Sequence, residues 1–167
     1  IGGMIMTHSD DKGLVLPPRL AATQVVIVPF ISKPESKARI LEVSEKLAAD
    51  IRAQSYAGES VSVLLDTDET KQMGWKFHEY ELLGIPLRIE VGPRDLEKGQ
   101  IVLTRRDTGA KEFLPLDGFA SKVPTLLTDM QAGLLARAQA FREANTFETT
   151  DYAQFSKDLD AKGGFYL

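Results

Sequence analysis

The residues best suited to chemistry in this sequence are a phenylalanine and a glutamate four positions apart. Phe77 and Glu81 are adjacent on one face of the helix predicted over 70–83. An aromatic ring can stack on a purine base, and a carboxylate can accept hydrogen bonds from N–H groups on the edge of that base. Guanine offers two such donors on one edge, N1–H and the exocyclic amine, whereas adenine offers one. The pair is therefore suited to binding a purine.

Basic residues gather in the same part of the chain. Alternation places Arg88 on the polar face of a strand predicted over 87–91, and Arg94 and Asp95 lie in the turn that follows. Residues 71–111 hold eight Lys or Arg against six Asp or Glu, a local charge of +2 in a chain of net charge −4. Charge alone favours a solvated face with scattered ion pairs. Aromatic and arginine side chains together favour single-stranded nucleic acid, whose bases are held by stacking and by edge hydrogen bonds.

Other reactive groupings have simpler structural explanations. The group of His8, Ser9, Asp10 and Asp11 is too compressed in sequence to imply a catalytic triad, and a turn with Asx capping is favoured. His78 has no second histidine one helical turn away, so zinc is not predicted. The acidic loop 66–69 is expected to cap a helix that begins near Thr70.

The elements that must position these residues follow an α/β pattern. Strands are predicted over 24–29, 61–65, 87–91, 100–105 and 112–116, and helices over 34–54, 70–83 and a long segment from Pro124. The order βαβαβββα predicts a mixed five-stranded sheet flanked by three helices. Strand 24–29 is a nearly continuous apolar run, which indicates burial on both faces.

The second predicted helix carries apolar residues on two sides. Trp75 and Leu82 share one side, while Met73, Phe77 and Tyr80 share the nearly opposite side. One core cannot use both sides. Either the helix is sandwiched between two layers, which is the commoner arrangement, or an aromatic stripe faces solvent for a reason.

Length and composition set the limits of the fold. A chain of 167 residues that is 43% apolar and 26% charged can bury one sizeable core, so one main domain is expected. The lack of cysteine excludes disulfides, thiolate metal sites and thiol nucleophiles. No apolar run is long enough to span a bilayer and no signal region opens the chain, so a cytoplasmic location is expected. The net negative charge argues against indiscriminate coating of nucleic acid.

The two ends of the sequence suggest a fragment. The chain opens with Ile1 and two glycines, without an initiating methionine, and it stops at Leu167 just after a second glycine pair. Pro17 and Pro18 form a stiff extended boundary. We expect a domain border there.

Several strings of residues together resemble prolyl-tRNA synthetases of the form shared by eukaryotes, archaea and some bacteria. The resemblance covers essentially the whole chain, and its first string is highly specific. The strings are Asp10–Pro18 (DDKGLVLPP), Gln24–Pro29 (QVVIVP), Gly74–Glu81 (GWKFHEYE) and Gly92–Asp95 (GPRD).

This resemblance implies a fold and a division of the chain. Residues 1–18 would be the end of the class II catalytic domain, whose ATP-binding arginine would lie just upstream of Ile1. Residues 19–145 would be the anticodon-binding domain of a class II aminoacyl-tRNA synthetase, with the same mixed α/β sheet. Residues 146–167 would be the start of a small C-terminal domain that is often zinc-bearing.

The resemblance also implies which residues read the RNA. The family's base-reading positions, which recognise two adjacent guanines of the proline anticodon, fall on Phe77, Glu81, Arg88, Arg94 and Asp95. Arg94 can be lysine in relatives. No catalytic or metal-binding residue falls within the chain. The parent enzyme would use ATP and Mg²⁺ to attach proline to tRNA(Pro), as a homodimer, while this fragment alone would bind tRNA without activity.

Two other functions compete with this interpretation. A protein-interaction or dimerisation module could use the same α/β fold without RNA specificity, although the set of Phe77, Glu81 and Arg94 argues against it. A small nucleotide-binding enzyme of flavodoxin-like shape would need a glycine-rich phosphate loop, which the sequence lacks.

Overall fold

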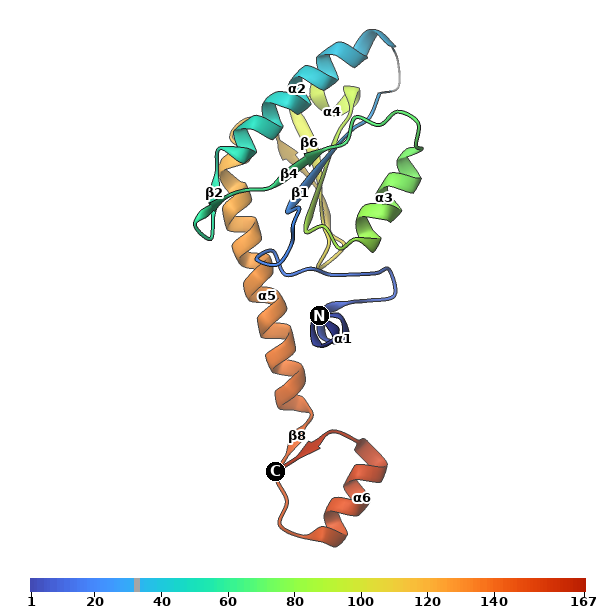
Figure 1. Cartoon of the computed structure of the whole chain (residues 1–167), viewed down its shortest axis with the longest axis vertical. Helices are drawn as coiled ribbons and strands as arrows, with labels where there is room; N and C mark the ends of the chain where they lie inside the picture. The colour runs from blue at the N-terminus through green and yellow to red at the C-terminus, as the bar shows by residue number, and fades with distance from the viewer. Residues whose placement is uncertain (32–33) are drawn as a thin grey trace. The chain divides into compact units, whose positions relative to one another are not determined.

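The chain forms two compact units in a computed structural model that describes residues 1–31 and 34–167. Unit 1 covers Ile1–Ala132 and holds the sheet, and unit 2 covers Gly133–Leu167. Figure 1 follows the chain from the N-terminal helix α1 (Gly2–His8) to the C-terminal strand β9 (Phe165–Tyr166).

Unit 1 is built on a mixed five-stranded sheet of order β4-β1-β5-β6-β7. Strand β1 is parallel to both of its neighbours, β4 and β5, whereas β6 is antiparallel to both β5 and β7. The sheet predicted from the sequence is confirmed. Its strands are β1 (Val25–Pro29), β4 (Val63–Leu65), β5 (Leu87–Val91), β6 (Gln100–Arg105) and β7 (Lys111–Pro115).

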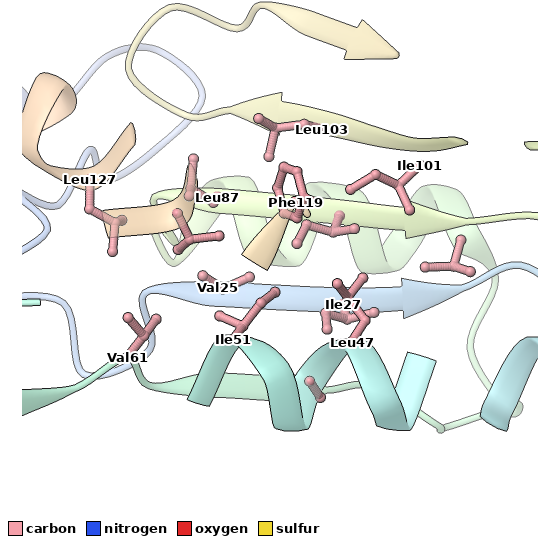
Figure 2. Close-up of a cluster of buried hydrophobic side chains, with 14 of the residues drawn as sticks. Val25, Ile27, Leu47, Ile51, Val61, Leu87, Ile101, Leu103, Phe119 and Leu127 are labelled. Atoms are coloured by element: carbon pink, nitrogen blue, oxygen red, sulfur yellow. The ribbon is translucent and has the colours of Figure 1, made fainter. Parts of the chain in front are cut away.

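One face of the sheet carries the main hydrophobic core. Helices α2 (Pro34–Arg52) and α5 (Val123–Ala144) supply side chains such as Leu47, Ile51 and Leu127, which pack on alternate residues of the strands (Figure 2). Phe119 fills the centre of this cluster and is fully buried. Strand β1 is buried at all five positions, as its continuous apolar run predicts.

The opposite face of the sheet is covered by helix α3 (Met73–Leu82), which lies across the sheet from α2 (Figure 1). Met73, Phe77 and Tyr80 pack there against Val26, Val28 and Ile85. The expectation of a sandwiched helix is wrong, because the other side of α3 faces solvent: Trp75 is 47% exposed and Leu82 is 48% exposed. The aromatic stripe faces the sheet rather than solvent.

Helix α3 begins later than predicted, and the acidic loop before it does not cap it. The helix begins at Met73 rather than near residue 70, and its N-cap, Gln72, makes no side-chain cap hydrogen bond. The acidic residues instead form turns, since Asp66 accepts from the backbone N–H of Asp68, and Asp68 accepts from that of Thr70. The side chains of this loop therefore shape the loop and not the helix terminus.

Short elements were not visible in the sequence pattern. The segment after Val91 is a helix, α4 (Pro93–Glu97), with proline in its first turn, and not the predicted turn. A hairpin of β2 (Ser55–Tyr56) and β3 (Glu59–Ser60) precedes β4, which is shorter than the strand predicted over 61–65. A 3₁₀ helix, η1 (Ala120–Lys122), leads into α5.

Unit 2 is a small helix-and-strand unit with an aromatic cluster. Strand β8 (Thr146–Phe147) pairs in parallel with β9, and the helix α6 (Tyr152–Lys162) lies between them in sequence. The Tyr166 ring lies 5.3 Å from each of the rings of Phe147 and Phe155, measured between centres. Asp151 caps α6 by accepting from the backbone N–H of Ala153.

Length and apolarity together decide whether a helix can cross a bilayer. None of the helices in the described residues is both long and apolar enough to do so.

Candidate nucleic-acid interface

Phe77 and Arg88 form the centre of the site. The Arg88 guanidinium, on β5, lies 4.1 Å from the centre of the Phe77 ring, on α3. Arg88 also donates from Nη1 to the Phe77 carbonyl oxygen at 3.4 Å, and its side chain is only 12% exposed. A base that stacks on Phe77 therefore meets Arg88 as the direct neighbour of that ring.

Glu81 and Arg88 line the same small cavity. Its volume is about 10 Å³, room for a single water molecule. The lining residues are Tyr80, Glu81, Ile85, Arg88, Thr104, Arg105 and Arg106. Two buried polar atoms, Arg88 Nε and Thr104 Oγ1, have no hydrogen-bond partner among residues 1–31 and 34–167. Because buried polar groups are almost always paired, a single water in this cavity would satisfy these two atoms.

The charges beside Arg88 extend across the sheet. Arg88, Thr104 and Lys111 lie side by side on β5, β6 and β7, since Arg88 pairs with Thr104 and Thr104 with Lys111. Glu90 is bridged by Arg88 Nη2 at 3.4 Å and by Lys111 Nζ at 2.9 Å. One carboxylate against two cations leaves this row with a net charge of +1, which favours a polyanion.

An ionic clamp holds the C-terminal end of α3. Arg106, itself buried, donates from both Nη atoms to the Asp10 carboxylate at 2.7 and 2.6 Å, and from Nε to the Glu81 carbonyl oxygen at 3.0 Å. The hydrogen bonds from Arg106 lower the pKa of Asp10 to about 2. Lys12, in the same turn, lies 3.7 Å from the Glu81 carboxylate. The segment 10–13 therefore fixes the backbone that carries Glu81.

A buried ion pair holds the N-terminal half of α3. Lys76 Nζ lies 3.0 Å from Asp66 Oδ1, and the Tyr80 hydroxyl donates to Asp66 Oδ2 at 2.7 Å. Burial alone would raise the pKa of Asp66, but the hydrogen bonds from Tyr80 and Lys76 outweigh it and lower that pKa. Burial and the hydrogen bond to Asp66 raise the pKa of Tyr80. Phe77 and Glu81 each follow one of these anchoring residues directly in sequence.

Arg94 and Asp95 lie apart from the other three predicted residues. Both belong to α4, past the carboxyl end of β5, whereas Arg88 is the second residue of that strand. Arg94 is exposed. The Asp95 carboxylate and the exposed Phe30 ring both lie near Gly92, because a Cβ placed on Gly92 would be 3.0 Å from Asp95 Oδ2 and 3.8 Å from Phe30 Cδ1. The five residues thus form two groups: a first group of Phe77, Glu81 and Arg88 on α3 and β5, and a second group of Arg94 and Asp95 on α4.

Sequence reasoning missed the residues that position the site. Lys76 reads as a solvated lysine, yet its side chain is 5% exposed. Its pairing with Asp66 spans a loop and has no local signal. Arg106 and Asp10 are 96 positions apart, so no periodicity connects them. The only usable signal was the resemblance itself, whose first string contains Asp10.

The geometry of the first group suits a guanine edge. The Glu81 carboxylate can accept from N1–H and the exocyclic amine, while the Arg88 guanidinium can donate to the base's carbonyl oxygen or ring nitrogen. The Phe77 ring adds stacking, which is tolerant of base identity. In the described part of the chain, no group of three or more His, Asp or Glu side chains is placed to hold a metal ion.

The sheet order and its covering helices form an α/β domain, a fold consistent with an anticodon-binding domain. The anticodon binding domain family matches residues 24–126, which is more than half of the chain. The chain therefore belongs to this family.

The relatives confirm the resemblance found in the sequence. The chain is 45% identical over 165 residues to a protein named proline–tRNA ligase 2 in Bacillus cereus, covering 99% of this chain and 33% of that protein. It is 45% identical to the proline–tRNA ligase of Christiangramia forsetii, with 99% and 32% covered. It is 42% identical to that of Rubrobacter xylanophilus, with 100% and 34% covered. The chain spans about a third of the length of these relatives.

Proposed function

We propose that this chain reads the guanines of the proline anticodon in tRNA(Pro). The observation that carries the proposal is the meeting of Phe77, Glu81 and Arg88 on one face of the sheet, in a chain similar along its whole length to proline–tRNA ligases. The first group would take one guanine. Arg94 and Asp95 would take the adjacent guanine, beside Phe30.

The proposal extends to a longer protein that joins proline to tRNA(Pro). Its relatives are three times the length of this chain, and ATP and Mg²⁺ would be held by the remaining part, which would act in the cytoplasm as a homodimer. The division of the chain at residues 18 and 145 stays a prediction. In this proposal the chain supplies RNA binding only, so the 167-residue chain should neither activate proline nor charge tRNA.

A direct test compares two anticodon stem-loop RNAs that differ only at the guanines. We expect the chain to bind the proline anticodon at least tenfold more tightly than the same stem-loop with both guanines replaced by adenine, since each good edge pair contributes about 1–3 kcal/mol. Binding should weaken with salt, by about 0.7 log units of affinity per phosphate contact for each tenfold rise in salt.

The control variant for this test is Leu20→Ala. Leu20 is 66% exposed and lies before the first strand, outside both groups, so this variant should bind like the native chain. Equal affinity of the native chain for the two RNAs would refute anticodon reading. It would favour the alternative of a protein-interaction or dimerisation module without RNA specificity. Proline-dependent exchange of pyrophosphate into ATP by the 167-residue chain would refute the proposal that this chain binds RNA without activating proline.

A further inference from the structure

The surface beyond Arg88 carries an exposed aromatic residue that the family's base-reading positions do not include. Phe113 lies on β7 and is 61% exposed. Strand β7 is the edge strand next to β6. A large apolar side chain on an open edge promotes unwanted association, so its presence calls for a partner.

Strand register places Phe113 on the same face of the sheet as Arg88. Glu90 pairs with Val102 on β6, and Val102 pairs with Phe113 on β7. Residues that pair directly across strands point to the same face, and Glu90 and Arg88 are two positions apart, which also places them on one face. Phe113 therefore stands two strand spacings from Glu90, about 10 Å.

The neighbours of Phe113 favour an anion over an apolar protein partner. Lys111 precedes it by two positions on the same face and its side chain is 49% exposed. Glu90, which could repel an anion, is already bridged by Arg88 and Lys111. An exposed ring beside a net positive row is the arrangement by which sheet surfaces hold unpaired bases.

We propose that Phe113 stacks on a further unpaired base of the RNA whose guanine is read at Phe77 and Glu81. The inference rests on the proposed function and deepens it, because it extends the reading surface across β6 to the edge strand. Stacking on a lone ring is tolerant of base identity. This contact should therefore strengthen binding of any anticodon loop without changing the preference for guanine.

The experiment uses the 167-residue chain and an anticodon stem-loop carrying the proline anticodon. Phe113→Ala should weaken binding by about fivefold to 150-fold, the range that removal of one base-stacking ring produces. Phe113→Trp should bind like the native chain because it keeps the aromatic face. The loss should be the same for the stem-loop with adenine in place of the guanines. Phe141→Ala is the matched control, since Phe141 is 68% exposed but lies on α5, outside the sheet.

A second readout reports stacking itself. With 2-aminopurine placed in turn at the loop positions flanking the guanines, the native chain and Phe113→Trp should quench the fluorescence of one position, and Phe113→Ala should not. Unchanged affinity and quenching for Phe113→Ala, with weakened binding for Phe77→Ala, would overturn this inference alone. Unchanged binding for both variants would overturn the proposed function as well. A change in self-association of Phe113→Ala, without a change in RNA affinity, would assign the ring to a protein contact and overturn the inference.

Discussion

The buried ion pair between Lys76 and Asp66 gives the most quantitative prediction for helix α3. In Asp66→Asn the lysine keeps its charge but loses its counter-ion. The Lys76 side chain is 5% exposed and that of Asp66 is 7% exposed, so only water in the cavity of about 310 Å³ that both residues line can reach the lysine when its partner is lost. Breaking a buried pair in this way costs about 3–5 kcal/mol of unfolding free energy. The Tyr80 hydroxyl can still donate to the asparagine, so we expect about 3 kcal/mol.

The assay is urea denaturation of the native chain, Asp66→Asn, Lys76→Met and the double variant. Because the double variant buries no charge, it should recover most of the loss, with a coupling of at least about 2 kcal/mol in the cycle. The matched control is Glu69→Gln in the same loop. It breaks the pair of Glu69 with Lys37, whose side chains are 57% and 43% exposed, and it should cost less than about 1 kcal/mol.

Two outcomes would refute this reasoning. If Asp66→Asn lowered the unfolding free energy no more than Glu69→Gln does, Lys76 would not be buried beside Asp66 as it is in the structure. If the losses of the two single variants simply added in the double variant, Lys76 and Asp66 would not interact, and this buried pair would not anchor the N-terminal half of α3.

Two further predictions concern the segment 10–16. The pKa of Asp10 is lowered from 3.8 to about 2, so its ion pair with Arg106 stabilises the fold above about pH 4 and loses this effect as the pH falls toward 2. Since the Asp10 side chain is 47% exposed, Asp10→Asn should cost about 1 kcal/mol of unfolding free energy at pH 7 and almost nothing near pH 2. A cost that urea titrations find independent of pH would contradict the ion pair. Gly84 and Gly118 have nearly the same positive φ, 71° and 68°, but a Cβ on Gly84 would lie 2.6 Å from the Leu14 carbonyl oxygen while one on Gly118 meets nothing within 4 Å. Gly118→Ala should therefore cost about 1 kcal/mol of unfolding free energy, and Gly84→Ala at least about 2 kcal/mol more. Equal urea midpoints for the two variants would show that the Leu14 backbone does not pack closely against Gly84.

The sheet could be predicted from the sequence because its signals are local. Val25–Pro29 is apolar throughout and the strand 87–91 alternates strictly, and both are buried as those patterns require. The long helix predicted from Pro124 begins at Val123, and Phe141 near its C-terminal end is 68% exposed although it is apolar. Periodicity predicts which face of a helix is apolar, but it does not predict how far along the helix that face is covered by other elements.

The site was harder to predict because it depends on distant contacts. The adjacency of Phe77 and Glu81 follows from helical spacing, and Arg88 falls on the right face by alternation. The contact of the Arg88 guanidinium with the Phe77 ring joins two elements and needs the fold. The orientation of α3 was ambiguous, because either apolar side could have faced the sheet. The buried pair of Lys76 and Asp66 resolves that ambiguity in the structure, and nothing in the local sequence indicates the pair.

The central claim is that Glu81 reads a guanine edge, and a double-mutant cycle tests it most directly. Glu81→Gln is combined with a guanine-to-adenine change in the anticodon stem-loop, and the four affinities are measured at one salt concentration. Replacing guanine should cost the native chain about 1–3 kcal/mol and the variant much less, because the carboxylate that accepts from both donors is gone. If the Glu81 contact with RNA were only electrostatic, Glu81→Gln would improve binding of every RNA and the two changes would add within about 0.5 kcal/mol. That result would contradict base reading by Glu81.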